Sequence, residues 1–268
     1  FFLNDLMTEC RDRAHVALLC IYSPVFLAAL VQVVRIHARS SEWTVQKAVH
    51  VLVAFDMLFR SLAHALDFTL VLNEPSPLFY MLWTLPGCIY FTIYTTIVTL
   101  WAKILHESYA QQPRPFSSTR VMIAANVVFY VVQIFIFCLL IWPTGSSQRR
   151  MYLRVQPYYL GATSLVAAAA FSVYGCRIYG AIGGGGRGRT TPFLRRVWRR
   201  VSALAVTVTT AFTLRGLADA LWVDVISHLS ECQMAAFQPP FYLVVEAIPC
   251  VVVLLSMSTL PPKRAAAP

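Results

Sequence analysis

The sequence predicts an all-α polytopic membrane protein, a bundle of seven transmembrane helices. Three observations carry this prediction: seven long apolar stretches with short polar joints, a composition that is 58% hydrophobic, and a charged fraction of only 13% over 268 residues. A soluble protein of this length has about twice that charged fraction. Helices are favoured over barrel strands because apolar runs such as Leu165 to Phe171 are continuous and do not alternate with polar residues.

Each predicted span exceeds the roughly 20 residues that a helix needs to cross about 30 Å of hydrocarbon. Turn residues separate consecutive spans at 73–77, 112–115, 143–146 and 183–186. Thr191 and Pro192 form an N-cap and a first-turn proline that predict the start of the sixth span. In order, the spans are expected at 14–38, 44–72, 78–108, 119–142, 152–182, 193–223 and 238–259.

These spans divide the chain into three parts. Residues 1–13 are expected to be an exoplasmic flank, residues 14–260 a single seven-helix transmembrane domain, and residues 261–268 a truncated cytosolic tail. The lipid bilayer is therefore the solvent for almost the whole chain.

The distribution of Lys and Arg predicts the orientation. With the amino terminus outside and the carboxyl terminus in the cytosol, most of the 22 basic residues fall on the inner side, and this arrangement satisfies the positive-inside rule. Arg149, Arg150 and Arg154 on the outer side oppose it. The inner residues predict a cytosolic basic surface for partners, formed by Lys47, Arg114, Arg187, Arg189, Arg195, Arg196, Arg199, Arg200, Lys263 and Arg264.

The net charge of +10 does not indicate nucleic-acid binding. The basic residues flank hydrophobic spans and do not form one solvated face with interleaved stacking aromatics. No direct nucleic-acid contact is therefore expected.

Ionisable side chains within the spans predict an intramembrane polar network. In the second span, Asp56, Arg60 and His64 follow each other at spacings of four, which places them on one helical face, where Asp56 can pair with Arg60. A charge at mid-bilayer costs about 2.5–3.5 kcal/mol on insertion scales, so this face is expected to point into the bundle. Spans four, six and seven add Asn126, Arg215, Asp219 and Glu246.

Two interpretations of this network stay open. The groups can form a salt-bridge network that fixes how the spans pack, or they can line a polar cavity that receives a ligand or relays protons.

The cysteines and histidines provide no recognisable metal or catalytic motif. Cys10 and Cys232 both map to the outer side and are the candidate pair for a disulfide. The sequence has no HExxH, no GxSxG and no histidine set at a common depth, so we expect no catalytic residue, no metal site and no cofactor.

Several segments together resemble a known family. They are 42–47 (EWTVQK) with Arg60 thirteen residues later, 100–102 (LWA), 126–134 (NVVFYVVQI), 244–249 (VVEAIP) and 260–264 (LPPKR). This pattern is similar to the plant tobamovirus multiplication protein family, also called the THH/TOM domain family, from about residue 30 onwards. The residues that carry the likeness include Trp43, Thr44, Gln46, Lys47, Trp101, Pro249, Pro261 and Pro262. The chain departs from the family at Lys103, where a glutamate is usual, and at Asp56 and Asp219.

The resemblance implies a seven-span, non-enzymatic protein of the vacuolar or endolysosomal membrane. Plant members of the family are host factors that tether tobamovirus replication proteins to membranes and associate with an Arf-like small GTPase. We therefore expect a membrane scaffold that recruits cytosolic partners. A receptor-like signalling protein, a proton-coupled carrier that uses the intramembrane charges, and a homo-oligomer remain alternatives.

Overall fold

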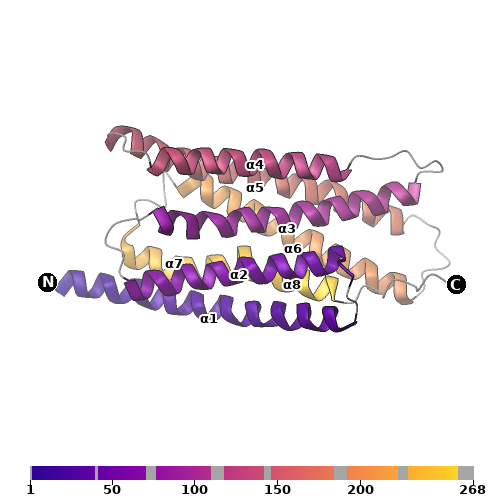
Figure 1. Ribbon diagram of the computed structural model, residues 1–268, viewed down its shortest axis with the longest axis horizontal. Helices are drawn as coiled ribbons and strands as arrows, with labels where there is room; N and C mark the ends of the chain where they lie inside the picture. Colours follow the sequence, from indigo (N-terminus) through magenta and orange to yellow (C-terminus); the bar gives the residue numbers. More distant parts are fainter. Residues whose placement is uncertain are drawn as a thin grey trace.

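A computed structural model of the chain describes residues 2–39, 42–70, 77–109, 118–141, 146–183, 192–222 and 229–258. Within these ranges the chain is helical apart from short joints, and the long helices run side by side (Figure 1). The helices are α1 (Phe2–Arg39), α2 (Val45–Leu70), α3 (Pro77–Tyr109), α4 (Ser118–Ile141), α5 (Ser146–Gly183), α6 (Pro192–Trp222) and α7 (Glu231–Tyr242), then the π-helical turn η2 (Leu243–Ala247) and α8 (Ile248–Met257).

Seven helical stretches among the described residues are long and apolar enough to cross a membrane, with mean hydropathies from 1.3 to 2.4. The last of them is built from α7, η2 and α8 together. The all-α, seven-span part of the prediction is confirmed. The spans are Glu9–Ala38, Val45–Asp67, Met81–Lys103, Thr119–Leu139, Arg154–Gly180, Arg199–Leu221 and Cys232–Met257.

At the end of the bundle where α1 begins, two helices extend beyond the predicted span boundaries. Residues 2–13, expected as a flank, continue α1, and an exposed ion pair between Glu9 and Arg13 four residues apart supports this turn. The seventh helix begins at Glu231 and not at 238, because a capping box starts it. Ser230 accepts a hydrogen bond from the backbone of Gln233, whose side chain accepts one from the Ser230 backbone.

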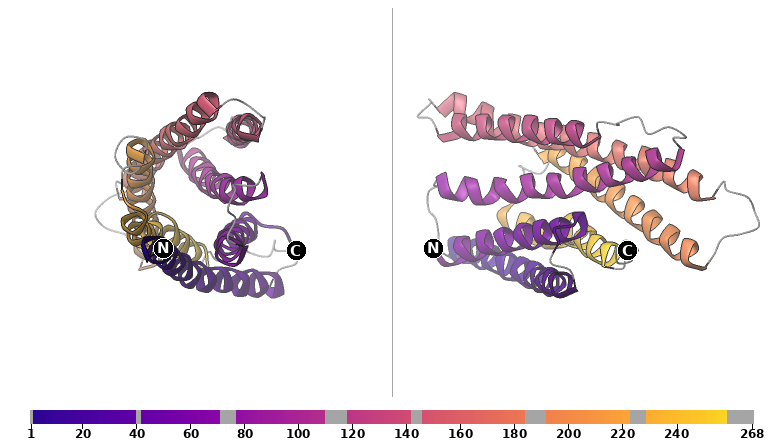
Figure 2. Two further views of the ribbon diagram at one scale, coloured as in Figure 1. Left: turned by 90° about the vertical axis from the view of Figure 1, so that its left-hand side faces the viewer. Right: turned by 45° about the vertical axis from the view of Figure 1, so that its right-hand side comes forward.

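The seven passages form a closed circuit when seen end-on (Figure 2). Each helix from α1 to α5 packs against the next one, α6 packs against η2 and α8, and α7 packs against α1. The start of α1 and the end of α8 lie at opposite ends of the bundle, as an odd number of crossings requires (Figure 1). A disulfide between Cys10 and Cys232, with Cα atoms 5.2 Å apart, joins α1 to the start of α7.

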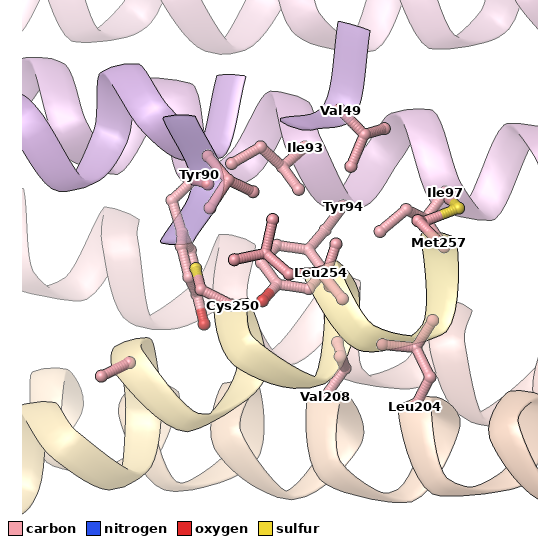
Figure 3. Packing of buried hydrophobic residues seen from close by; sticks show 14 of the residues in the cluster. Val49, Tyr90, Ile93, Tyr94, Ile97, Leu204, Val208, Cys250, Leu254 and Met257 are labelled. Carbon is pink, nitrogen blue, oxygen red and sulfur yellow. The ribbon is translucent and has the colours of Figure 1, made fainter. Parts of the chain in front are cut away.

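The buried core follows α8 along its length. Figure 3 shows Cys250 and Leu254 of α8 facing Tyr90 and Tyr94 of α3, and Val208 approaches from α6. Since lipid tails are as apolar as leucine, contact between helices in a membrane depends on close packing and on hydrogen bonds. The fit of these side chains therefore contributes directly to the stability of the bundle.

Small residues bring α5 and α6 into backbone contact. A Cβ atom added at Gly161 would lie 3.0 Å from the carbonyl oxygen of Gly216, and one added at Gly216 would lie 2.8 Å from the Leu165 side chain. Only glycine fits at such a crossing. The contact also fixes the position of Arg215, the residue before Gly216.

We expect Gly216→Ala to destabilise the bundle, because the added methyl group overlaps with Leu165 and with the Gly161 carbonyl. Overpacking of this kind costs roughly 1–3 kcal/mol. For a chain of this size, each kcal/mol lowers the melting temperature by about 2–4 °C. The measurement is thermal unfolding of the purified protein in lipid nanodiscs. Gly180→Ala is the matched control, because a Cβ atom there meets nothing within 4 Å. Equal melting temperatures for the two variants would contradict the proposed close crossing.

Candidate functional site

The candidate site is centred on Glu246, a carboxylate with 0% exposure within η2. This turn is π-helical, with the Ile248 amide donating to the carbonyl of Leu243 five residues earlier. Pro249 follows and has no N–H group to donate to the carbonyl of Val245. The hydroxyl of Tyr90 in α3 donates to that carbonyl at 2.5 Å. A widened turn whose spare carbonyl is bound by another helix is typical of functional positions.

Three donors from three other helices converge on Glu246. Nη2 of Arg60 in α2 donates to its Oε1 at 2.6 Å, and Nη1 of Arg215 in α6 donates to the same oxygen at 2.7 Å. The hydroxyl of Tyr22 in α1 donates to Oε2 at 2.8 Å. We call Glu246, Arg60, Arg215, Tyr22 and Asp219 the central charge cluster.

Aromatic rings and a second carboxylate surround the two guanidinium groups. The Arg60 guanidinium lies 5.9 Å from the ring centre of Tyr242, and that of Arg215 lies 5.4 Å from the ring of Tyr90. Such distances allow cation–π attraction, which is stronger away from water. Nε of Arg215 is 3.8 Å from Asp219, an ion-pair distance too long for a hydrogen bond. Spans two, six and seven therefore meet as predicted through Arg60, Arg215 and Glu246.

The pairing of Asp56 with Arg60 that their spacing allowed is not formed in the structure. Arg60 turns to Glu246, and neither oxygen of Asp56 has a hydrogen-bond partner, although Asp56 is only 1% exposed. Asp56 interacts electrostatically with the charged side chains of Arg60, Glu246 and Arg215. A carboxylate on a neighbouring helix can face a guanidinium directly, and here Glu246 occupies the position that intrahelical spacing suggested for Asp56.

His64 belongs to a separate polar chain, nearer the end of the bundle where α1 begins. Its Nδ1 lies 3.1 Å from Nδ1 of His15 in α1, and Nε2 of His15 lies 3.0 Å from Asp67. The ring of His64 stacks on Tyr22, with centroids 5.7 Å apart. Tyr22 thus lies between the histidine pair and the central charge cluster.

Asn126, which the sequence assigned to the charge network, lies instead in a neutral seam between α3 and α4. Its side-chain nitrogen donates to Thr95 at 2.8 Å, and its oxygen accepts from Thr92 at 2.9 Å. Tyr130 of α4 also meets Thr92 at 2.8 Å. Interhelical hydrogen bonds of this kind hold membrane helices together, so the role of Asn126 is packing.

The family-like segment at 42–47 connects α1, α2 and α8 at the end of the bundle where α2 begins. The hydroxyl of Thr44 accepts from the Lys47 amide and caps α2, while the Gln46 side chain donates to the carbonyl of Met257 at the end of α8. Lys47 is 2% exposed, with Nζ 3.3 Å from His37 and 6.0 Å from the Trp43 ring. Placing Lys47 on the partner surface was therefore wrong. Trp43 itself is 71% exposed.

Two other family-like residues, Trp101 and Pro249, are buried within the helix bundle. Trp101 is 4% exposed and packs against Phe171 with ring centroids 5.4 Å apart. Pro249 is buried in α8 directly after the π-helical turn. Pro261 and Pro262 lie outside the described residues.

The predicted basic surface is described in part. Arg195 and Arg196 lie in the first turns of α6, Arg199 is exposed, and Arg200 is half-buried. Its remaining members, apart from Lys47, lie outside the described residues: Arg114, Arg187, Arg189, Lys263 and Arg264. Thr191, the predicted N-cap of the sixth span, lies outside them too.

Sequence reasoning missed the aromatic partners of the cluster. Tyr22, Tyr90 and Tyr242 lie in apolar runs, where tyrosine usually indicates an interfacial anchor. Nothing in their local sequence distinguishes a hydroxyl that binds a buried carboxylate from one that faces a headgroup. Over the described ranges, no group of three His, Cys, Asp or Glu side chains is placed to hold a metal ion.

Comparisons with known proteins agree with the motif likeness. A family model described as the THH1/TOM1/TOM3 domain matches residues 4–268. Tobamovirus multiplication protein 1 of Arabidopsis thaliana is 29% identical over 274 residues, which cover 97% of this chain and 88% of the relative. Tobamovirus multiplication protein 3 of the same plant is 29% identical over 263 residues, with coverages of 95% and 82%. Tobamovirus multiplication protein 1 of Nicotiana tabacum is 27% identical, with coverages of 97% and 88%.

The cluster predicts that Arg60→Met is strongly destabilising. The change removes one of the two guanidinium groups that balance a carboxylate with 1% side-chain exposure. Breaking a buried ion pair costs about 3–5 kcal/mol. The measurement is thermal unfolding in nanodiscs. Arg13→Met is the matched control, because Arg13 forms an exposed pair with Glu9 on α1 and exposed pairs contribute little. Similar small shifts for both variants would argue against a stabilising role of the buried pair.

Proposed function

The chain belongs to the THH1/TOM1/TOM3 domain family of multi-pass membrane proteins, and from this membership we propose that it is a non-enzymatic membrane scaffold. Its bundle holds a basic end toward the cytosol, where that end recruits protein partners. The proposed partners are an Arf-like small GTPase and, following the names of its relatives, components of tobamovirus multiplication. The proposed location is the vacuolar or endolysosomal membrane.

The observation that carries this proposal is the charge difference between the two ends of the bundle. At the end where α2, α4 and α6 begin, Glu42 is the one exposed acidic side chain among those the structure describes. The other end mixes Glu9, Asp12 and Asp67 with its arginines. The basic surface at the first end favours partners with an acidic face. The exposed basic side chains of the first end are Arg35, Lys103, Arg120, Arg177 and Arg199.

The same difference supports an orientation with the amino terminus outside. Basic residues at the inner side of the spans satisfy the positive-inside rule. The disulfide between Cys10 and Cys232 lies at the opposite end, and disulfides persist on the oxidising, exoplasmic side of membranes. Two independent features thus favour the same orientation.

A second candidate, a receptor or proton-coupled carrier, is favoured by the buried charges of the central cluster and by Asp56. Buried ionisable residues in a membrane bundle often mark a pathway. A carrier would show flux driven by a pH gradient in proteoliposomes and would lose that flux on Asp56→Asn. A receptor would show a ligand-dependent rise in melting temperature.

The scaffold proposal predicts that charge reversal at the basic end weakens partner capture. We expect protein in nanodiscs of neutral lipid to retain the GTP form of an Arf-like GTPase more strongly than the GDP form. Replacing Arg195, Arg196, Arg199 and Arg200 with Glu should lower this retention by at least about tenfold, because complementary charge is lost. Neutral lipid removes the attraction of basic residues to anionic headgroups.

The control is the pair Arg13→Glu and Arg154→Glu, whose exposed side chains lie at the opposite end of the bundle. It should leave retention unchanged. Equal retention of the two nucleotide forms would reject the GTPase as partner. Unchanged capture by the variant with four reversed charges would remove the basic end from the proposal.

A further inference from the structure

Each arginine of the central charge cluster has two acidic neighbours. Arg60 binds Glu246 at 2.6 Å and has Asp56 four residues earlier on its own helix. Arg215 binds Glu246 at 2.7 Å and has Asp219 four residues later, at 3.8 Å. Because residues four apart lie on one face of a helix, both arginines can reach an acidic residue on their own helix.

In a second arrangement, Arg60 would pair with Asp56 and Arg215 with Asp219. Several atoms that these pairs would use have no hydrogen-bond partner in the described structure. They are both carboxyl oxygens of Asp56, Nε of Arg60 and Oδ2 of Asp219. All of these atoms are buried. An unsatisfied buried polar atom carries a free-energy penalty, so the second arrangement gains hydrogen bonds where the observed one lacks them.

Among the five ionisable groups, the carboxyl groups outnumber the guanidinium groups by one. Two guanidinium groups face three carboxyl groups, namely Asp56, Asp219 and Glu246. A net charge in a membrane interior is costly, so electroneutrality requires one proton shared among the three carboxyl groups. In the observed arrangement Glu246 accepts three hydrogen bonds and Asp56 accepts none, which assigns the proton to Asp56.

We propose that the central charge cluster together with Asp56 is a two-state switch. In the second state the proton has left a carboxyl oxygen of Asp56 and is bound to Glu246, Arg60 pairs with Asp56, and Arg215 pairs with Asp219. One O–H bond breaks and one forms, and the five groups remain neutral in total in both states. No other reactant is needed.

The groups that surround the switch come from every helix packed against it. Glu246 faces Tyr22 of α1, Tyr90 of α3 and Tyr242 of α7 in addition to the two arginines. Asp56 interacts electrostatically with Tyr94 of α3 and with Cys250 of α8. His64 of the histidine pair follows Arg60 by four residues in α2. In the proposed step the proton moves between Asp56 and Glu246, and these surrounding groups keep their protonation states.

The switch reaches the inner end through α8. In the observed state Glu246 is bound by three helices and holds the π-helical turn in place. The end of α8, at Met257, is bound by Gln46 beside the exposed Trp43. Releasing Glu246 breaks the side-chain hydrogen bonds that hold this turn. The turn and α8 then have two alternative arrangements, and α8 connects the membrane interior to the end that carries the basic residues.

A double-mutant cycle between Asp56→Asn and Glu246→Gln tests the switch. Asp56→Asn alone should change the melting temperature little, because the protonated carboxyl has no partner to lose. Glu246→Gln alone should lower it moderately, because both arginines move to Asp56 and Asp219. In the double variant Arg60 has no carboxylate left, and the loss should exceed the sum of the single effects by about 4 °C or more. A fixed network predicts additive shifts. The control is Asp12→Asn, which should be additive with Glu246→Gln.

Infrared spectroscopy keeps the test decisive if Glu246→Gln does not fold. The native protein should show the absorption of one protonated carboxyl group, and Asp56→Asn should remove it. Where Glu246→Gln folds, it should also remove the band although Asp56 is intact, because Asp56 then ionises against Arg60. Absence of the band in the native protein, its survival in Asp56→Asn, or its survival in folded Glu246→Gln would overturn the proposal.

Discussion

Glu246 has 0% exposure within the seventh span, where a carboxylate is stable only if charges and donors from other helices surround it. Arg60 and Arg215 supply the charges, and Tyr22 supplies a third hydrogen bond. These contacts require α1, α2, α6 and η2 to meet at one point. In a bilayer, where apolar surface gains little by leaving lipid, such a requirement determines which helices are neighbours.

Two features of the backbone allow this meeting. The π-helical turn at Leu243–Ala247 places Glu246 inside the bundle, and the Tyr90 hydroxyl binds the Val245 carbonyl, to which Pro249 cannot donate. The crossing of Gly161 and Gly216 brings α6 against α5 directly beside Arg215. The site and the helix packing therefore depend on each other.

The sequence predicted the spans well because hydrophobic length is a local property, and it predicted that Arg60, Arg215 and Glu246 belong together because intramembrane charges must find partners. Errors arose where the partner depended on three-dimensional packing. Intrahelical spacing favoured Asp56 for Arg60, and the basic character of Lys47 favoured an exposed position. Glu246 occupies the first place, and packing against Trp43 and His37 buries the second. Glu246 is far from Asp56 in the sequence, and His37 is ten residues from Lys47. Of these contacts, only that of Trp43 with Lys47 is local in the sequence.

The residues that carry the family likeness mostly have structural tasks here. Thr44 caps α2, Gln46 binds the end of α8, Lys47 is buried, Trp101 packs against Phe171, and Pro249 follows the π-helical turn. The likeness therefore describes the architecture. Selection of a partner needs exposed side chains. At the end where α2, α4 and α6 begin, these include Trp43 and the basic residues at the helix ends. A bundle of this construction can keep its packing while the chemistry of that surface changes, because the buried cluster and the surface share no residue.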